Sequence, residues 1–311
     1  MKKNRNRSTK MTGAGMIAVG MMAAAMLAAA MAMTGCAKKE PEVIKIASKP
    51  MTEQYILTEI LGQLIEHDLG VQVEITKGVG GGTTNIQPAL LKGDFDLYPE
   101  YTGTGWLTVL KKEQENDSAV LYENLQKGYE EMGLHWTGLY GFQNSYVIAV
   151  RSEIADEYKL TTFSDLSAVS QNLVFGGNPD YMEREDGFNY LASSYDMNFK
   201  DVKDFDIALK YTAMADGQID ATNAFTTDAQ LNAANVRLLE DDKHIFATYY
   251  GGTVVRQDTL KKFPGLEATL EKLTGQISDD EMRAMNYAVE VEQKDEKDVA
   301  KEFLTSKELL K

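Results

Sequence analysis

The chain has 311 residues, of which 43% are hydrophobic and 25% are charged, a composition typical of folded globular proteins and unlike that of disordered ones. Its formal net charge is −15, and the first 35 residues carry five basic side chains and no acidic one, so the remainder is more acidic still. Nucleic-acid binding depends on basic side chains that neutralise phosphates, so this charge argues against a nucleic acid as partner.

The N-terminus has the layout of a bacterial secretory signal. A basic stretch that ends at Lys10 is followed by the uncharged segment Met11–Met33, which is rich in Ala and Met. A permanent membrane anchor is the alternative, because 23 uncharged residues can span a bilayer. The sequence Met33-Thr34-Gly35-Cys36 then resembles a lipobox, with Met33 at the position where leucine is most usual.

Cys36 is the only cysteine of the chain. We expect residues 1–35 to be a signal peptide that is removed, and Cys36 to become lipid-modified. Residues 36–42 would then be a polar tether to the outer face of the bacterial cytoplasmic membrane. A lipidated Cys36 leaves no cysteine for a disulfide, a metal site or a nucleophile.

The first part of the mature chain alternates between strand and helix patterns. Period-two patterns or β-rich composition predict strands, and apolar residues at helical spacing predict helices. The expected elements are a strand over Val43–Ser48, a helix over Thr52–Leu69, a strand over Val71–Thr76, a short helix over Asn85–Lys92 and a strand over Phe95–Tyr101. This order predicts a mostly parallel sheet flanked by helices.

The same alternation continues through the rest of the chain. The expected elements are helices over Glu123–Met132, Phe163–Val169, Gly187–Tyr195 and Ile207–Asp216, strands over Ser145–Val150 and Asn172–Gly177 and within Gln218–Phe225 and Tyr250–Val255, and a helical region from Leu260. We interpret this as two α/β units, the second inserted into the first. Lobe I would comprise residues 43–144 and 250–311, lobe II residues 145–249, and the chain would cross near Gly141–Tyr146 and Ile245–Gly252.

Motifs for cofactors, metals and catalysis are missing from the sequence. The glycine run Lys77–Asn85 (KGVGGGTTN) lies between a strand and a helix, where an anion can bind, but it lacks the Gly-Lys-Ser/Thr of a P-loop and the third glycine of GxGxxG. We therefore favour a flexible turn with Thr84 or Asn85 as the helix cap. The three histidines belong to no metal-binding motif, so we expect no metal and no cofactor.

Aromatic residues gather at the ends of the predicted strands. Tyr101, Tyr146, Phe225 and Tyr249 all have such positions, and ligands of open α/β sheets bind beyond the carboxyl ends of strands. Converging rings would form a cage that attracts a quaternary ammonium group. The alternative is core packing, which is the commoner fate of aromatic side chains. Glu100 is the one acid embedded among aromatics, in LYPEYTGTGW, and without a partner group it makes a weak case for acid–base catalysis.

Seven ordered blocks across the mature chain resemble the substrate-binding lipoproteins of osmoprotectant ABC transporters, which bind glycine betaine, proline betaine, carnitine or choline. The blocks are SKPMTEQYILTEI (48–60), GVGGGTTN (78–85), DLYPEYTGT (96–104), LVFGGNPDYMEREDG (173–187), AFTTDAQL (224–231), LLEDDK (238–243) and MRAMNYAVEVEQKD (282–295). The resemblance implies a two-lobed, periplasmic-binding-protein-like α/β fold with hinge strands and a ligand cleft between the lobes. It also implies delivery of ligand to an ABC permease, without catalysis.

The resemblance further implies which residues face the ligand. Positions of the aromatic cage are matched by Tyr101, Tyr146, Tyr249 and Phe225, and positions that hold the ligand's carboxylate by Lys49, Thr104 and Arg184. Phe225 stands where relatives often have tyrosine, so it keeps the ring and loses the hydroxyl. Thr104 is a neutral donor that suits a carboxylated betaine, whereas an acid there would suit choline.

Three alternatives remain at this point. The protein could prefer choline or another small cation within the same family. It could be a sensor lipoprotein that binds its ligand without transport. Least expected is an enzyme that uses Glu100 as an acid or base.

Overall fold

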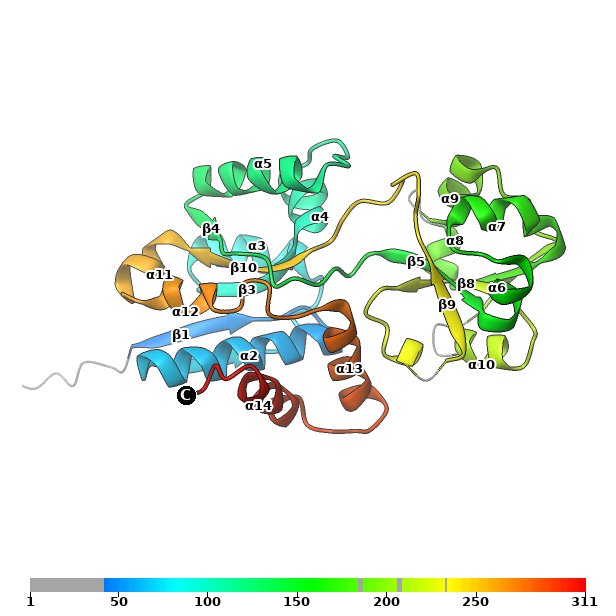
Figure 1. Cartoon of the computed structure of the whole chain (residues 1–311). Helices are drawn as coiled ribbons and strands as arrows, with labels where there is room; N and C mark the ends of the chain where they lie inside the picture. The colour runs from blue at the N-terminus through cyan, green and yellow to red at the C-terminus, as the bar shows by residue number, and fades with distance from the viewer. Residues whose placement is uncertain (1–41, 184–186, 206–208, 233) are drawn as a thin grey trace, which may run out of the picture. The chain divides into compact units, whose positions relative to one another are not determined.

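A computed structural model describes residues 42–183, 187–205, 209–232 and 234–311 (Figure 1). The predicted signal peptide, Cys36 and Arg184 lie outside these residues. No helix within the described ranges combines the length and the apolar character needed to cross a membrane.

The first sheet has five strands in the spatial order β2-β1-β3-β10-β4. Their bounds are Gln72–Thr76, Val43–Ala47, Leu97–Tyr101, Gly251–Arg256 and Leu134–Trp136. Strand β1 pairs in parallel with β2 and β3, and β10 pairs antiparallel with β3 and β4. The parallel strands are joined through helices α2 (Thr52–Leu69) and α3 (Thr83–Lys92), as the alternating pattern predicted.

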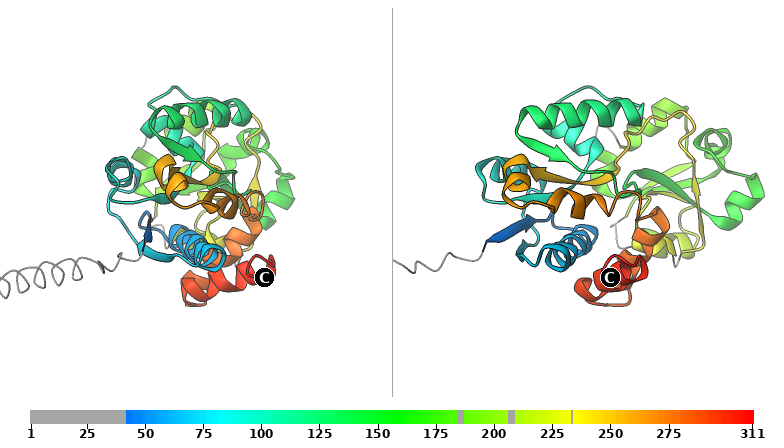
Figure 2. Two further views of the ribbon diagram at one scale, coloured as in Figure 1. Left: turned by 90° about the vertical axis from the view of Figure 1, so that its left-hand side faces the viewer. Right: turned by 60° about the vertical axis from the view of Figure 1, so that its left-hand side comes forward.

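Helices cover both faces of the first sheet, because its buried strands are apolar on both sides. Ile44 and Ile46 of β1 pack toward α2, together with helices α12 (Leu266–Glu271), α13 (Asp279–Glu290) and α14 (Glu296–Ser306). Helices α2 and α14 lie side by side in every view (Figures 1 and 2). On the other face, Ala47 and Tyr98 pack against α3 and α5 (Ser118–Glu131).

The second sheet also has five strands, in the order β7-β6-β8-β5-β9. Their bounds are Asp201–Asp204, Val174–Gly177, Ala221–Phe225, Tyr146–Arg151 and Val236–Leu239. The helices around it are α6 (Ser152–Tyr158), α7 (Phe163–Val169), α8 (Pro179–Glu183), α9 (Phe188–Tyr195) and α10 (Lys210–Ala215). Ile148 and Val150 of β5 face one core cluster while Ala149 faces the other, as period-two alternation requires.

Two chain segments connect the sheets and run beside each other. Gln143 and Tyr250 form an antiparallel bridge, and the amide N–H of Asn144 donates to the carbonyl of Tyr249 at 3.0 Å. The first segment continues into β5 and the second into β10. The prediction of a mostly parallel first sheet is confirmed with one exception: β10 returns from the other sheet and so opposes both β3 and β4, as β5 opposes its neighbours in the second sheet.

Several boundaries differ from the sequence prediction for local reasons. Helix α3 begins at Thr83 after Gly82 and has no side-chain cap, so the expected caps Thr84 and Asn85 are wrong. Helix α5 begins earlier than predicted, at Ser118, because Asp117 caps it by accepting from two backbone N–H groups. The region after Leu260 is helical as expected, starting with α11 (Gln257–Lys262).

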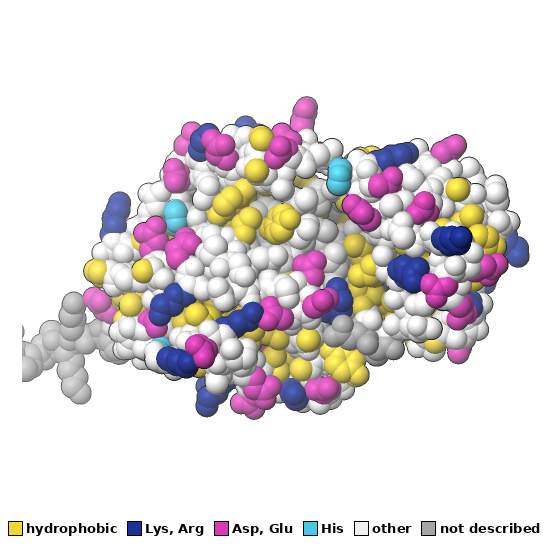
Figure 3. All heavy atoms as spheres, in the orientation of Figure 1, with side chains coloured by type: hydrophobic (Ala, Val, Ile, Leu, Met, Phe, Trp, Pro, Cys, Tyr) yellow, Lys and Arg dark blue, Asp and Glu magenta, His cyan; other side chains and the backbone are white. Residues whose placement is uncertain are grey.

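The surface carries charges of both signs. Acidic and basic side chains are interspersed over the described part of the face in Figure 3, and they do not separate into one acidic and one basic patch there.

Candidate functional site

A pocket of about 560 Å³ lies where strand ends, the crossing segments and α13 meet. Its lining comes from both sheets and both crossing segments: Lys49, Met51, Thr52, Glu53, Tyr101, Thr104, Asn144, Tyr146, Phe225, Thr227, Asp228, Ala229, Tyr249, Asn286 and Glu290. The lining runs from Lys49 to Glu290, so segments far apart in the sequence share one pocket. The volume is in the range of small-molecule sites in proteins.

The structure brings six of the seven candidate ligand-binding residues to this pocket. They are Lys49, Tyr101, Thr104, Tyr146, Phe225 and Tyr249. The seventh, Arg184, lies outside the described residues. Tyr98 and Glu100, which alternate with Tyr101 along β3, do not line the pocket.

Tyr146 and Phe225 form a stacked pair across neighbouring strands. Tyr146 begins β5 and Phe225 ends β8, and the two residues are register partners. Their ring centroids are 4.8 Å apart with an interplanar angle of 28°. Tyr181 and Phe246 pack behind Tyr146, with centroids 5.2 and 5.3 Å from its ring. The pair is therefore held in place from behind while one side faces the pocket.

Tyr249 reaches the pocket because Gly103 leaves room for its ring. A Cβ atom on Gly103 would lie 2.7 Å from a ring carbon of Tyr249 and 2.9 Å from the backbone carbonyl oxygen of Thr248. Any larger residue at position 103 would displace one of them. Gly103 thus allows the crossing segment that carries Thr248 and Tyr249 to pack closely against the turn after β3.

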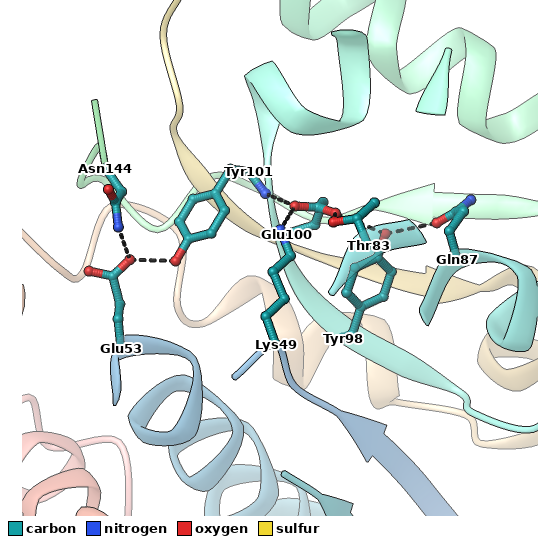
Figure 4. Close-up of polar contacts among 8 residues, drawn as sticks. All are labelled: Lys49, Glu53, Thr83, Gln87, Tyr98, Glu100, Tyr101 and Asn144. Carbon is teal, nitrogen blue, oxygen red and sulfur yellow. Dashed lines mark hydrogen bonds and ion pairs between the residues drawn. The ribbon is translucent and has the colours of Figure 1, made fainter. Parts of the chain in front are cut away.

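Lys49 is paired with a buried carboxylate behind the pocket (Figure 4). Its Nζ forms an ion pair with Glu100, which is 0% exposed, and lies 4.7 Å from the centroid of the Tyr101 ring. Glu100 also accepts from the Thr83 hydroxyl at 2.6 Å and from the Tyr101 amide N–H at 2.7 Å. Both oxygens of Glu100 are occupied, so it supports Lys49 and is not placed to transfer a proton to a ligand.

Glu53 is the centre of a second network that sequence reasoning missed. It is the second residue of α2, is 3% exposed and lines the pocket. Its Oε1 accepts from the Tyr101 hydroxyl at 2.5 Å and from Asn144 Nδ2 at 3.0 Å (Figure 4), and its Oε2 accepts from Asn286 Nδ2 at 3.2 Å. Asn286 also donates to the backbone carbonyl of Thr227 at 3.0 Å. One carboxylate thus connects α2, β3, a crossing segment and α13.

Burial raises the pKa of Glu53 above its ordinary value of 4.5, against the opposing effect of the hydrogen bonds from Tyr101 and Asn144. At pH values between 4.5 and the raised pKa, Glu53 is therefore more often protonated in the folded state than in the unfolded state. The free energy of unfolding falls as the pH rises through this range. We expect the free energy of unfolding of the wild type, relative to that of Glu53→Gln, to be greatest below pH 4.5 and to decline with rising pH. Urea unfolding of both proteins across this pH range measures the two free energies of unfolding. If the difference between them does not change with pH, the pKa of Glu53 is not raised by folding.

Most of the other pocket residues that sequence reasoning missed lie inside the blocks already recognised. They are Met51, Thr52, Asn144, Thr227, Asp228, Ala229, Asn286 and Glu290, of which all but Asn144 belong to the blocks SKPMTEQYILTEI, AFTTDAQL or MRAMNYAVEVEQKD. The signal was therefore present as sequence blocks. Only the fold shows which side chains of those blocks face the pocket. Among the described residues, no cluster of three or more His, Cys, Asp and Glu side chains could hold a metal ion.

A family model matches residues 42–306, which is nearly all of the described chain. Its description is the substrate binding domain of the ABC-type glycine betaine transport system. The match spans both sheets and every element that contributes to the pocket.

Named relatives agree with this match. The chain is 44% identical over 266 residues to an ergothioneine transport permease/ergothioneine binding protein of Helicobacter pylori, covering 85% of this chain and 48% of that protein. It therefore spans about half of that relative's length. It is 37% identical over 277 residues to a carnitine transport binding protein of Listeria monocytogenes, covering 88% and 89% of the two chains. The crystal structure of a glycine betaine/carnitine/choline ABC transporter superposes with a TM-score of 0.82 at 30% identity, over 86% of this chain and 100% of that one.

Proposed function

We propose that the chain, which belongs to the family of substrate-binding domains of ABC-type glycine betaine transport systems, captures a quaternary ammonium compound and passes it to an ABC permease. Proteins of this family bind solutes for transport and are not enzymes, which removes the alternative of Glu100 as a catalytic acid. The observation that carries the proposal is the presence of four aromatic side chains, three from the two sheets and one from a crossing segment, around one pocket that Lys49 also lines.

The aromatic side chains provide the site for the ammonium group. Tyr101 and Tyr249 enter the pocket from the first sheet's side, and Tyr146 and Phe225 from the second. A trimethylammonium group has no N–H to donate, so π-faces, which attract a cation without a hydrogen bond, are suited to it. Each desolvated ring contributes on the order of 0.5–2 kcal/mol.

The region around Lys49 and Thr104 provides the site for the ligand's carboxylate. Glu100 neutralises Lys49, so Lys49 acts here as a hydrogen-bond donor and adds no surplus positive charge. The first turn of α2, which begins at Thr52 on the pocket wall, adds the positive end of a helix dipole. We propose that Arg184, which the family resemblance points to, completes this anion site.

The proposed ligand class is a carboxylated quaternary ammonium compound. The names of the Helicobacter and Listeria relatives point to ergothioneine and carnitine, and the family description to glycine betaine. All three compounds join a trimethylammonium group to a carboxylate. Choline has no carboxylate, and a preference for choline over all three would overturn the assignment of Lys49 and Thr104.

The proposed transport cycle depends on a ligand that contacts residues of both sheets at once. A ligand that touches Tyr101 and Phe225 together stabilises the arrangement in which both line one pocket, by its differential affinity for it. We propose that lipid-modified Cys36 holds the protein at the outer face of the cytoplasmic membrane, and that the ligand-bound form docks on the permease. Genes for a permease and an ATPase beside this one would separate transport from a sensor role.

Isothermal titration calorimetry with glycine betaine, carnitine, ergothioneine and choline tests the ligand class. The control ligand is 3,3-dimethyl-1-butanol, which copies the shape of choline without its positive charge. If cation–π attraction drives binding, choline binds measurably and its neutral copy binds much more weakly. Failure of all four cationic ligands to bind at millimolar concentration would refute the proposal.

Phe225 offers a test of the ring itself. We expect Phe225→Leu, which keeps the apolar bulk and removes the π-face, to weaken binding of the preferred ligand by about 2- to 30-fold. The control Phe225→Tyr keeps the ring stacked on Tyr146 and should stay within about threefold of the wild type. Calorimetry on the three proteins measures this; equal affinities of the leucine and tyrosine variants would show that the ring has no cation-binding role.

A further inference from the structure

Asp228 lines the pocket from the turn that follows β8, and the hydrogen bonds it accepts from the described residues all end on one of its two carboxylate oxygens. Its Oδ2 accepts from the Tyr211 hydroxyl at 2.8 Å, from Lys210 Nζ at 3.2 Å and from the backbone N–H of Phe225 at 3.2 Å. Its Oδ1 accepts no hydrogen bond from any side chain or backbone group within the described residues. The side chain is 26% exposed and lines the pocket, so we take Oδ1, which the described residues leave without a donor, as the oxygen that a ligand can reach.

Lys210 forms an ion pair with this carboxylate at the pocket wall. The Lys210 side chain is 2% exposed, and its Nζ donates to the carbonyl of Asn223 at 2.9 Å as well as to Asp228. A buried ammonium group is costly unless it is paired, and Asp228 is the carboxylate that pairs it. The pair has no net charge, so Asp228 offers a strong acceptor without making that wall of the pocket more negative.

A second unfilled acceptor lies on the pocket wall. Asn286 is 5% exposed, and its Nδ2 is committed to Glu53 and to the Thr227 carbonyl. Its Oδ1 has no hydrogen-bond partner among the described residues. Buried acceptors left unfilled are uncommon, and this one belongs to a residue that lines the pocket.

We infer that Asp228 selects for a ligand that carries an O–H or N–H donor in addition to its trimethylammonium and carboxylate groups. This inference rests on the proposed function and refines it. Glycine betaine has no such donor, carnitine has a hydroxyl, and ergothioneine has two ring N–H groups. The cavity of about 560 Å³ has room for the larger of these compounds.

The substitution Asp228→Asn tests this with almost no change of shape. The donors from Lys210, Tyr211 and the Phe225 backbone all require an oxygen on the inner side, so the amide oxygen of asparagine takes the place of Oδ2. The amide NH₂ then takes the place of Oδ1. The pocket loses an acceptor and gains a donor that faces the ligand's own donor.

Calorimetry on the full-length protein compares carnitine, ergothioneine, glycine betaine and γ-butyrobetaine, which is carnitine without its hydroxyl. We expect D228N to weaken carnitine or ergothioneine, whichever the wild type binds more tightly, by about tenfold or more, because a hydrogen bond to a charged acceptor is lost. γ-Butyrobetaine should change by less than about threefold. The matched control Glu290→Gln removes the same charge from the pocket lining and should weaken all four ligands by one common, small factor.

The outcomes separate this inference from the proposed function. If D228N weakens γ-butyrobetaine as much as the donor-bearing ligand, or weakens neither, the inference is wrong while the proposed function stands. If the wild type binds none of the four, both are wrong. Should D228N fail to fold, K210M/D228N removes the buried cation together with the anion and takes its place. The wild type offers a further test. If it binds carnitine no more tightly than γ-butyrobetaine, and ergothioneine no more tightly than glycine betaine, the inference is also wrong.

Discussion

Replacing Lys49 by methionine is expected to lower the free energy of unfolding by about 3–5 kcal/mol, the cost of removing one partner of a buried ion pair. The carboxylate of Glu100 is 0% exposed and would keep its hydrogen bonds from Thr83 and Tyr101, but no cation would remain beside it. Methionine fills most of the volume of the lysine stem, so the effect isolates the charge. Urea unfolding followed by circular dichroism measures the change.

Two controls give this result its meaning. Lys127→Met breaks an exposed pair between side chains that are 62% (Lys127) and 69% (Glu123) exposed, and should leave the free energy of unfolding nearly unchanged. Glu100→Gln in the Lys49→Met background removes the buried, unpaired carboxylate charge and should restore most of the lost free energy of unfolding. A Lys49→Met protein as stable as the wild type would show that Glu100 does not depend on Lys49. Ligand affinities of Lys49 variants are meaningful only once this stability effect is known.

Replacing Tyr101 by alanine is expected to weaken every quaternary ammonium ligand by about tenfold to a hundredfold. The substitution removes a ring that contributes on the order of 0.5–2 kcal/mol by cation–π attraction, together with apolar contact area. Because the ring acts on the ammonium group, ligands with and without a carboxylate should be weakened alike. Calorimetry with carnitine and choline measures both.

The matched variant Tyr101→Phe separates the ring from its hydroxyl. It keeps the π-face and removes only the hydrogen bond to Glu53. We expect affinity within about fivefold of the wild type and a stability loss of about 1–2 kcal/mol, because the Glu53 carboxylate loses a buried donor. If the phenylalanine variant loses as much affinity as the alanine variant, ligand binding depends on the hydroxyl and its hydrogen bond to Glu53, and the ring makes no contribution of its own.

Much of the fold was predictable because its signals are local. The apolar spacing in Thr52–Leu69 predicted α2 with its observed bounds, and alternation predicted β1 and β2 to within one residue at each end. Strand β4, over Leu134–Trp136, is too short for a periodic pattern and was missed. The antiparallel direction of β10 depends on the chain leaving the first sheet and returning to it, which no local pattern contains.

The candidate site was predictable for the residues that stand out in composition. Tyr101, Tyr146 and Phe225 were visible as aromatic residues at strand ends, and the structure brings them to one pocket. Glu53 was not visible, because an acid in the first turn of a helix is usually a solvated residue that favours the helix dipole. Asp228 was hidden for a similar reason: acids are common in turns, and its buried partner Lys210 is 18 positions away.

The network around Glu53 limits how this site can change in evolution. Its carboxylate satisfies donors from Tyr101, Asn144 and Asn286 at once, so a substitution at any of the four positions leaves buried polar groups unpaired in several parts of the fold. Thr104 and Phe225 have no place in that network. Divergence of ligand preference among relatives is therefore expected to run through such positions, while Glu53 and its donors are inherited or lost together.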